Sequence, residues 1–100
     1  MNLKETIEMM VSSDYKERFI AEYKQLEIRR NGLYNMLKKY KAGELPFTPS
    51  CSYDLLNGQL KAMDMYSGYL EERAKIENIK NVIPVIGITP PKSSIISDLL

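Results

Sequence analysis

Two arginines stand side by side in the run Arg29-Arg30-Asn31-Gly32, and residues of these types could bind an anion. Guanidinium groups pair with phosphate oxygens, and glycine permits close approach of a ligand or of another backbone. Two other interpretations of Arg30 stay open, because a long cationic side chain can reach from an apolar helix face to solvent or fix the register of two packed helices. The run marks Arg29, Arg30 and Asn31 as candidate ligand residues.

Two further places combine tyrosine with a cationic residue. Tyr15 and Lys24 precede the arginine run, and Tyr66, Tyr69 and Arg73 follow it. A tyrosine ring stacks on a nucleobase, and a lysine or arginine beside it neutralises a phosphate. Tyrosines are also common at interfaces between subunits, so the same residues fit an ordinary surface or an oligomer contact.

Residues for catalysis are scarce. The chain has no histidine, and it contains no nucleophile motif, glycine-rich phosphate loop or metal-ligand cluster. Glu71 and Glu72 are neighbours in sequence, so a helix points them in different directions. The single cysteine, Cys51, can form no internal disulfide, and a zinc site needs more ligands than one thiol. We therefore expect a binding protein, not an enzyme, with no catalytic residues, no metal and no cofactor.

The composition is that of a globular protein, with 44% hydrophobic and 27% charged residues. The chain has 14 Lys and Arg residues and 13 Asp and Glu residues, so it carries almost no excess of positive charge. This balance disfavours duplex or single-stranded nucleic acid as a partner. The longest apolar-rich stretch, Val82–Ile88, is far shorter than the roughly 20 residues of a membrane-spanning helix. Residues 1–11 include charged side chains that do not suit a signal peptide. We therefore expect a cytoplasmic protein with no membrane partner.

Three predicted helices position the candidate residues. Asn2 can cap a short first helix, in which apolar residues recur at helical spacing as far as Val11. Ser12 or Ser13 is expected to cap a long second helix. The apolar seam of that helix alternates steps of four and three and includes Phe19, Tyr23, Leu26, Arg30, Leu33, Leu37 and Tyr40.

Gly43 suits the C-cap of the second helix, and two prolines after it prevent the helix from resuming. Residues 41–50 are therefore predicted to form a loop. Ser50 or Ser52 can cap a third helix, whose seam repeats the four-three alternation at Leu56, Leu60, Met63, Ser67, Leu70 and Ala74. The fold class we predict is all-α, with a short N-terminal helix and a long antiparallel two-helix hairpin.

A second, semi-polar stripe on the third helix suits contact with another subunit and consists of Leu55, Gln59, Ala62, Tyr66, Tyr69, Arg73 and Ile76. After Asn81, β-branched residues and prolines favour extended chain. We predict a helical domain at 1–80 and an extended apolar tail at 81–100 that docks on the body or on a neighbouring subunit. Since a chain of 100 residues has a thin core, a homo-oligomeric helical assembly is expected.

Several stretches resemble small phage proteins of the crAss-phage-related group. They are 15–26 (YKERFIAEYKQL), 33–37 (LYNML), 47–49 (FTP), 59–63 (QLKAM) and 70–77 (LEERAKIE). That group in turn resembles the anti-CBASS sponges, which are phage proteins that bind the cyclic nucleotide signals of bacterial antiviral systems and sequester them without cleavage.

The resemblance implies a compact helical oligomer, typically a hexamer, in the cytoplasm of a bacterial host. It implies cyclic dinucleotide pockets between protomers and separate trinucleotide pockets where three protomers meet. By position, the ligand-binding tyrosine corresponds to Tyr15, the basic residue of the following helix to Arg29 or Arg30, and the arginine of the LEER stretch to Arg73. Asn31 falls where a small hydroxyl residue can occur, and the apolar tail departs from the pattern.

We therefore predict a phage anti-defence sponge that binds cyclic di- or trinucleotides. Its predicted ligand-binding residues are Tyr15, Lys24, Arg29, Arg30, Asn31 and Arg73. The alternative is a helical protein–protein interaction module with no nucleotide ligand, which would dock through the Tyr66 and Tyr69 face or through the Val82–Ile88 arm.

Overall fold

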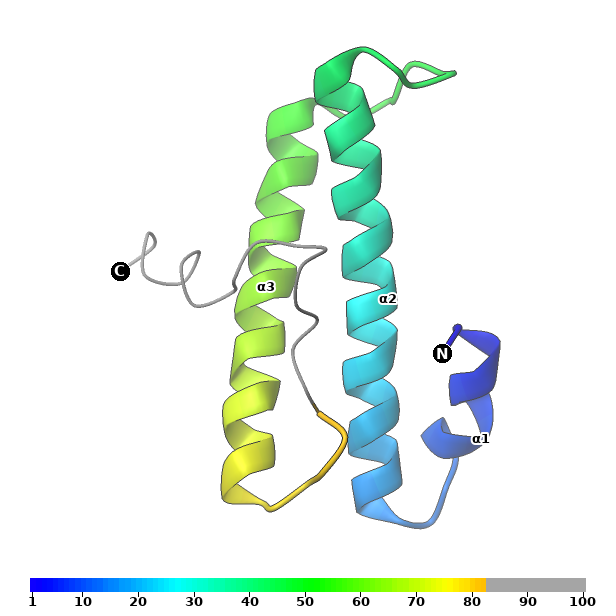
Figure 1. Ribbon diagram of the computed structural model, residues 1–100, viewed down its shortest axis with the longest axis vertical. Coiled ribbons are helices and arrows are strands. Elements are labelled where there is room, and N and C mark those ends of the chain that lie inside the picture. The colour runs from blue at the N-terminus through cyan, green and yellow to red at the C-terminus, as the bar shows by residue number, and fades with distance from the viewer. Residues whose placement is uncertain (83–100) are drawn as a thin grey trace.

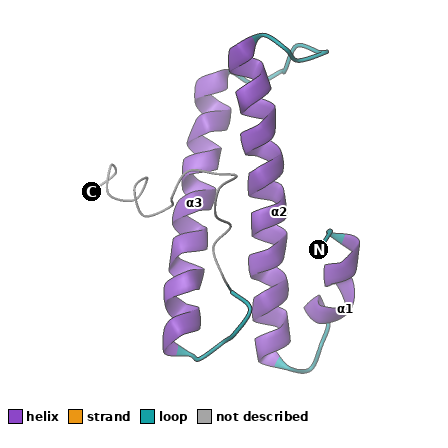
Figure 2. Cartoon of the chain, in the orientation of Figure 1, coloured by secondary structure: helices purple, strands orange, loops and turns teal. Residues whose placement is uncertain are grey.

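Two long helices dominate the structure, a computed structural model that describes residues 1–82. The elements are a 3₁₀ turn at Lys4–Thr6, α1 at Ile7–Met10, α2 at Tyr15–Ala42 and α3 at Tyr53–Ile76. α2 and α3 lie side by side and antiparallel, and α1 packs on the side of α2 away from α3 (Figure 1). The described residues contain only helices and loops (Figure 2), so the predicted all-α hairpin is confirmed. Most of the predicted tail, 83–100, lies outside the described residues.

The N-terminal segment is held against α2 by polar contacts. Leu3, and not the predicted Asn2, is the N-cap of the 3₁₀ turn, but Asn2 Oδ1 still accepts a hydrogen bond from the Glu5 N–H at 3.0 Å. Thr6 is completely buried, and its Oγ1 accepts a hydrogen bond from Gln25 Nε2 at 3.1 Å. Gln25 Nε2 also contacts Met10 Sδ. One side chain of α2 therefore anchors both the 3₁₀ turn and α1.

The start of α2 differs slightly from the prediction. Asp14, and not Ser12 or Ser13, is the N-cap, and its Oδ1 accepts a hydrogen bond from the Lys16 N–H at 3.0 Å. A carboxylate at this position satisfies a free N–H and also interacts favourably with the positive end of the helix dipole. Ser12 supports the cap from outside, since its Oγ accepts a hydrogen bond from the Asp14 N–H at 3.0 Å.

The hairpin turn carries the caps that its sequence predicts. Gly43 ends α2 with φ of 73°, a left-handed conformation that glycine adopts without strain. The Glu44 N–H donates to the Lys39 carbonyl at 2.9 Å. Ser52, the second of the two predicted caps, accepts a hydrogen bond from the Leu55 N–H at 3.1 Å. These caps close α2 and open α3 at defined residues.

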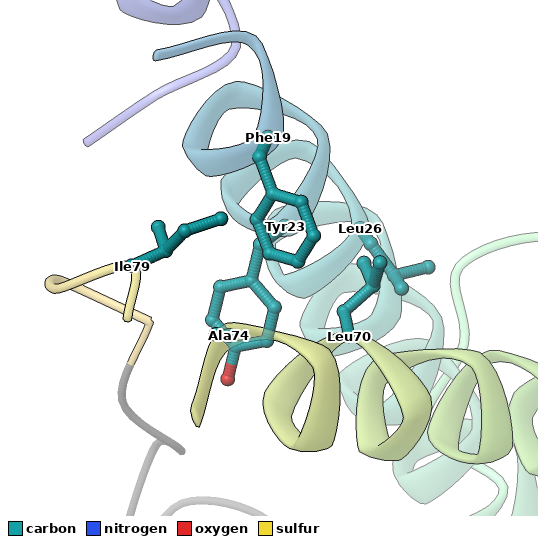
Figure 3. Close-up of a cluster of buried hydrophobic side chains, with 6 residues drawn as sticks. All are labelled: Phe19, Tyr23, Leu26, Leu70, Ala74 and Ile79. Atoms are coloured by element: carbon teal, nitrogen blue, oxygen red, sulfur yellow. The ribbon is translucent and has the colours of Figure 1, made fainter. Parts of the chain in front are cut away.

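The apolar core lies where the first half of α2 meets the second half of α3 (Figure 3). It consists of Phe19, Tyr23, Leu26, Leu70, Ala74 and Ile79. The predicted seam of α2 is buried except for Leu33 and Tyr40, which are half-buried. The seam of α3 is buried except for Leu56 and Met63, which are also half-buried. The four-three spacing therefore identified the packed faces of both helices.

Polar groups cross the same interface and are hydrogen bonded. Tyr23 Oη donates to Glu71 Oε2 at 2.6 Å, and Ser67 Oγ donates to Glu27 Oε1 at 2.6 Å. Burial, with the hydrogen bond to Glu71, raises the pKa of Tyr23 well above its usual value of 10.0. A hydrogen-bonded polar group can be buried at modest net cost, whereas an unpaired one cannot. These bonds allow tyrosine, serine and glutamate to occupy helix faces that pack together.

The chain after α3 returns to the core. Asn78 has φ of 55°, and the Ile79 N–H donates to the Ala74 carbonyl at 2.8 Å. A residue in the left-handed conformation, followed by a backbone hydrogen bond that reaches five residues back, is a Schellman motif. In this motif the residue after the turn packs on the last helical turn. Ile79 is buried against Phe19 and Ala74 accordingly (Figure 3).

The predicted outer stripe of α3 is exposed to solvent, and two of its side chains reach α2. Tyr66 Oη donates to Glu22 Oε2, and Arg73 Nη2 donates to Tyr15 Oη. The stripe's members Leu55, Gln59, Ala62, Tyr66, Tyr69, Arg73 and Ile76 are all exposed. The exposed fractions of Tyr69 and Ile76 are 66% and 84%. This stripe remains a predicted subunit contact. None of the helices within residues 1–82 has the length and apolar character that crossing a membrane requires.

Candidate functional site

Two of the predicted ligand residues meet at the open end of the hairpin. Arg73 Nη2 donates to Tyr15 Oη at 2.8 Å, although 58 positions separate the two residues. Tyr15 Oη in turn donates to Glu77 Oε1 at 2.7 Å, and Arg73 Nε donates to Glu77 Oε2 at 3.1 Å. The guanidinium of Arg73 lies over the Phe19 ring, 5.0 Å from its centroid. Tyr15, Phe19, Arg73 and Glu77 are called the Tyr15–Arg73 cluster below.

The antiparallel hairpin explains why this cluster forms. Tyr15 is the first residue of α2, directly after its Asp14 cap, while Arg73 lies in the last turn of α3. Antiparallel packing brings those two helix ends together. Arg18 also holds the segment that leads into α2, because its Nη1 donates to the Ser12 carbonyl at 2.7 Å. The position of Tyr15 is therefore determined by backbone caps as well as by its own contacts.

The charges of the cluster are coupled. The hydrogen bond from Tyr15 lowers the pKa of Glu77 below 4.5, and the nearby Arg73 lowers it further. The same bond to Glu77 raises the pKa of Tyr15, and the hydrogen bond to Glu77 raises the pKa of Arg73. At neutral pH the cluster thus holds a guanidinium, a carboxylate and a neutral phenol. Tyr15 is 46% exposed, so a ligand can reach this group.

Arg30 lies elsewhere, in the middle of the hairpin. Its Nε and Nη2 contact Asp64 Oδ1 and Oδ2 at 2.5 and 3.1 Å, and neither side chain is exposed. The Tyr34 ring packs against the guanidinium, with its centroid 5.1 Å away. The interpretation in which Arg30 extends to solvent is therefore wrong. A bidentate pair between the helices fits the other interpretation, in which Arg30 fixes their register.

The remaining predicted residues lie on other faces of α2. Lys24 and Asn31 are half-buried and, being seven positions apart, share one face. Asn31 Oδ1 is buried and accepts no hydrogen bond from the described residues. Arg29 is exposed and projects roughly 100° away from Arg30 around the helix. One protomer therefore brings together Tyr15 and Arg73, but not all six predicted residues.

The Tyr15–Arg73 cluster and the Arg30–Asp64 pair include three residues that were not predicted as site residues. Asp64 pairs with Arg30, Glu77 bridges Tyr15 and Arg73, and Phe19 supports the Arg73 guanidinium. The sequence does contain a signal for Asp64, which lies four positions after Leu60 and three before Ser67, on the buried face of α3. Within residues 1–82, no group of three or more histidine, cysteine, aspartate or glutamate side chains could hold a metal ion.

A family model with the description Sequestin matches residues 13–76. The chain belongs to the Sequestin family. The family's name suggests a sequestering function. The Sequestin region contains the Tyr15–Arg73 contact and the Arg30–Asp64 pair, while Glu77, Ile79 and the N-terminal segment lie outside it. Neither the curated proteins nor the solved structures include a significant match to this chain.

Proposed function

We propose that this protein sequesters cyclic di- or trinucleotides without cleaving them, as a phage anti-defence sponge in the bacterial cytoplasm. Its membership of the Sequestin family supports a sequestering role. The observation that carries the choice of ligand is the contact between Tyr15 and Arg73 at 2.8 Å on an exposed surface. An arginine and a tyrosine so placed combine phosphate binding with base stacking.

In the free protein, Glu77 is the hydrogen-bond acceptor for Tyr15 and Arg73 at this site. Its carboxylate accepts hydrogen bonds from both Tyr15 and Arg73, as a phosphate oxygen would. An incoming phosphate therefore competes with Glu77 for the Arg73 guanidinium. Because exposed ion pairs contribute little to stability, this competition costs the ligand little.

A second protomer completes the pocket in this proposal. Tyr66, Tyr69 and Ile76 are exposed on the outer stripe of α3, beside Arg73. Apolar and aromatic side chains of this kind are typical of subunit contacts, and symmetry repeats each contact around a closed ring. A homo-oligomer, with a hexamer as the expected form, presents several copies of the Tyr15–Arg73 cluster at its interfaces.

Sequestration requires only that free messenger becomes bound. The fraction captured depends on the protein concentration and the dissociation constant, and the ligand is released unchanged. Such a mechanism uses the fixed charges of the cluster and no proton transfer. The protein is a binding protein in this proposal, not an enzyme.

The test is native mass spectrometry of the purified protein with a panel of cyclic di- and trinucleotides, followed by heat denaturation and analysis of the released ligand. We expect an oligomer that binds ligand in whole-number stoichiometry and returns it intact. Arg73→Ala should weaken binding about tenfold or more, since a hydrogen bond to a charged group contributes about 1.5–3 kcal/mol. Tyr15→Phe, which keeps the ring, should have a smaller effect.

Lys75→Ala is the matched control. Lys75 is an exposed cation on the same helix, and it pairs with Glu72 instead of the cluster. Equal losses in Arg73→Ala and Lys75→Ala would indicate non-specific charge attraction. An oligomer that binds no member of the panel would instead favour the protein-interaction module, for which the exposed Tyr66, Tyr69 and Ile76 would be the docking face.

A further inference from the structure

A groove separate from the Tyr15–Arg73 cluster lies between α2 and α3, in the half of the hairpin nearest the turn. Its volume is about 450 Å³, within the usual range of small-molecule sites. The lining residues that matter here come from both helices and are Arg30, Tyr34, Lys38, Lys41, Tyr53 and Lys61. The groove therefore combines two tyrosine rings with four cationic side chains.

The rings of the groove are held in place by neighbouring side chains. Tyr34 packs against the Arg30 guanidinium, with its centroid 5.1 Å from Cζ. Tyr53 makes an edge contact with Tyr40, with 5.7 Å between their centroids and 75° between their planes. Leu37 and Leu60, both buried, complete the apolar part of the lining. A ligand ring would meet surfaces that are already ordered, which lowers the entropic cost of binding.

The side chains that line the groove carry a net positive charge. Asp64 neutralises Arg30, but Lys38, Lys41 and Lys61 are exposed and form no ion pair with any residue in 1–82. Three unpaired cations around one concave surface attract anions and concentrate them there. A neutral apolar ligand would make no use of them.

Arg30 supplies a further unmet donor. Its Nη1 is buried, and none of the described residues accepts a hydrogen bond from it. A buried charged donor without an acceptor is costly, so native structures usually provide a partner from protein, water or ligand. Arg30 lines the groove but is itself fully buried, so a ligand oxygen would satisfy this N–H only after a lining side chain moves aside.

We propose that this groove binds a small phosphorylated molecule with a flat ring, of the nucleoside monophosphate class. The ring packs against Tyr34 and Tyr53, while the phosphate lies among Lys38, Lys41 and Lys61. Inorganic phosphate alone would leave the tyrosine surfaces unused, and a nucleoside alone would leave the lysines unpaired. The groove is separate from the Tyr15–Arg73 cluster, because Arg30 and Tyr15 are separated by about 22 Å along α2.

The experiment is isothermal titration calorimetry of the full chain with adenosine 5′-monophosphate, adenosine and inorganic phosphate as three separate probes. We expect saturable binding of the monophosphate. Adenosine and inorganic phosphate should each bind at least about tenfold more weakly, since the ring and the phosphate each contribute more than 1.4 kcal/mol. Absence of saturable monophosphate binding overturns the proposal. Equal affinity for the monophosphate and for adenosine, or for the monophosphate and for inorganic phosphate, overturns it too.

Three lysine variants locate the site. Lys38→Ala and Lys61→Ala should each weaken monophosphate binding several-fold, whereas Lys39→Ala should not, because Lys39 follows Lys38 on α2 but does not line the groove. All three lysines are exposed, so the variants should keep the fold, which circular dichroism checks. Equal weakening by all three would show diffuse charge attraction and overturn the site. Arg73→Ala should leave monophosphate binding unchanged. The groove proposal and the cyclic nucleotide proposal are therefore tested by different variants, and either one can fail without the other.

Discussion

Arg30 and Asp64 form a bidentate ion pair in the centre of the hairpin, with neither side chain exposed to solvent. The two residues are 34 positions apart, one on each long helix. Removing two charges from water is expensive, and their mutual attraction offsets that cost only when the geometry is good. The pair therefore contributes less to net stability than to the alignment of α2 against α3, because any slip in register would leave both charges buried and unpaired.

Asp64→Ala should lower the free energy of unfolding by about 3–5 kcal/mol, because it leaves the Arg30 guanidinium buried without a counter-charge. The double variant Arg30→Met with Asp64→Leu should recover most of that loss, since it removes both charges and keeps apolar volume. Urea unfolding followed by circular dichroism measures both. A double variant no more stable than Asp64→Ala would show that the pair itself is the main source of stability.

Gly32, inside α2, and Gly43, its C-cap, should respond in opposite directions to substitution by alanine. At Gly32, inside the helix, an added Cβ would meet none of the described atoms within 4 Å, so Gly32→Ala should stabilise the protein by up to about 1 kcal/mol. At Gly43, where φ is 73°, Gly43→Ala should destabilise it by about 1 kcal/mol. Thermal unfolding of the two variants checks the signs. A destabilised Gly32→Ala would indicate a requirement for close approach at that position.

The cap of α3 offers a test with a neighbouring control. Ser52→Ala should cost about 1 kcal/mol, because the Leu55 N–H loses its hydrogen bond to the serine Oγ. Ser50→Ala changes the same side chain two residues earlier, at an exposed position outside the helix, and should be neutral. Chemical denaturation of both variants measures the difference, and equal effects would contradict the capping role of Ser52.

Tyr23 should make the fold sensitive to alkaline pH. Burial raises the pKa of Tyr23 above 10.0, so the neutral phenol is favoured in the folded state. Its contribution is fully present below pH 10.0, the value of the unfolded chain, and is lost as the pH rises above it. Tyr23→Phe should lose about 1–3 kcal/mol at neutral pH with the bond to Glu71, and should show a shallower loss of stability above about pH 10.

Thermal unfolding of both proteins from about pH 8 to about pH 11 measures this dependence. Tyr15→Phe serves as the control, since the Tyr15 phenol is exposed and its titration is less strongly coupled to folding. Parallel curves for the wild-type protein and Tyr23→Phe would contradict the assignment.

Local patterns predicted much of this fold. The steps of four and three through Phe19, Tyr23 and Leu26 identified the packed face of α2, because helical spacing fixes which residues share a face. Gly43 and Ser52 predicted where the hairpin turns for the same local reason, since backbone conformation and capping depend on a few adjacent residues. The cap of α2 is Asp14 instead of a serine, because several polar residues there compete for one role.

Pairings between the helices were harder to predict. The hairpin topology places Tyr15 near Arg73, but the bridge through Glu77 depends on side-chain conformations that no spacing specifies. Asp64 occupies a buried helical position, yet an aspartate is ordinarily expected at the surface unless its partner is known. The turn at Asn78 likewise depends on a tertiary contact, the packing of Ile79 in the core.

The return of Ile79 to the core has a practical meaning for anyone who shortens this chain. Residues 13–76 carry the family likeness, but a fragment with those limits would lack Ile79, which is buried in the core cluster with Phe19 and Ala74. It would also lack Thr6, which is completely buried and bonded to Gln25. The smallest fragment that can fold as this structure does is therefore longer than the family segment at both ends, and grafting or truncation should preserve at least residues 2–82.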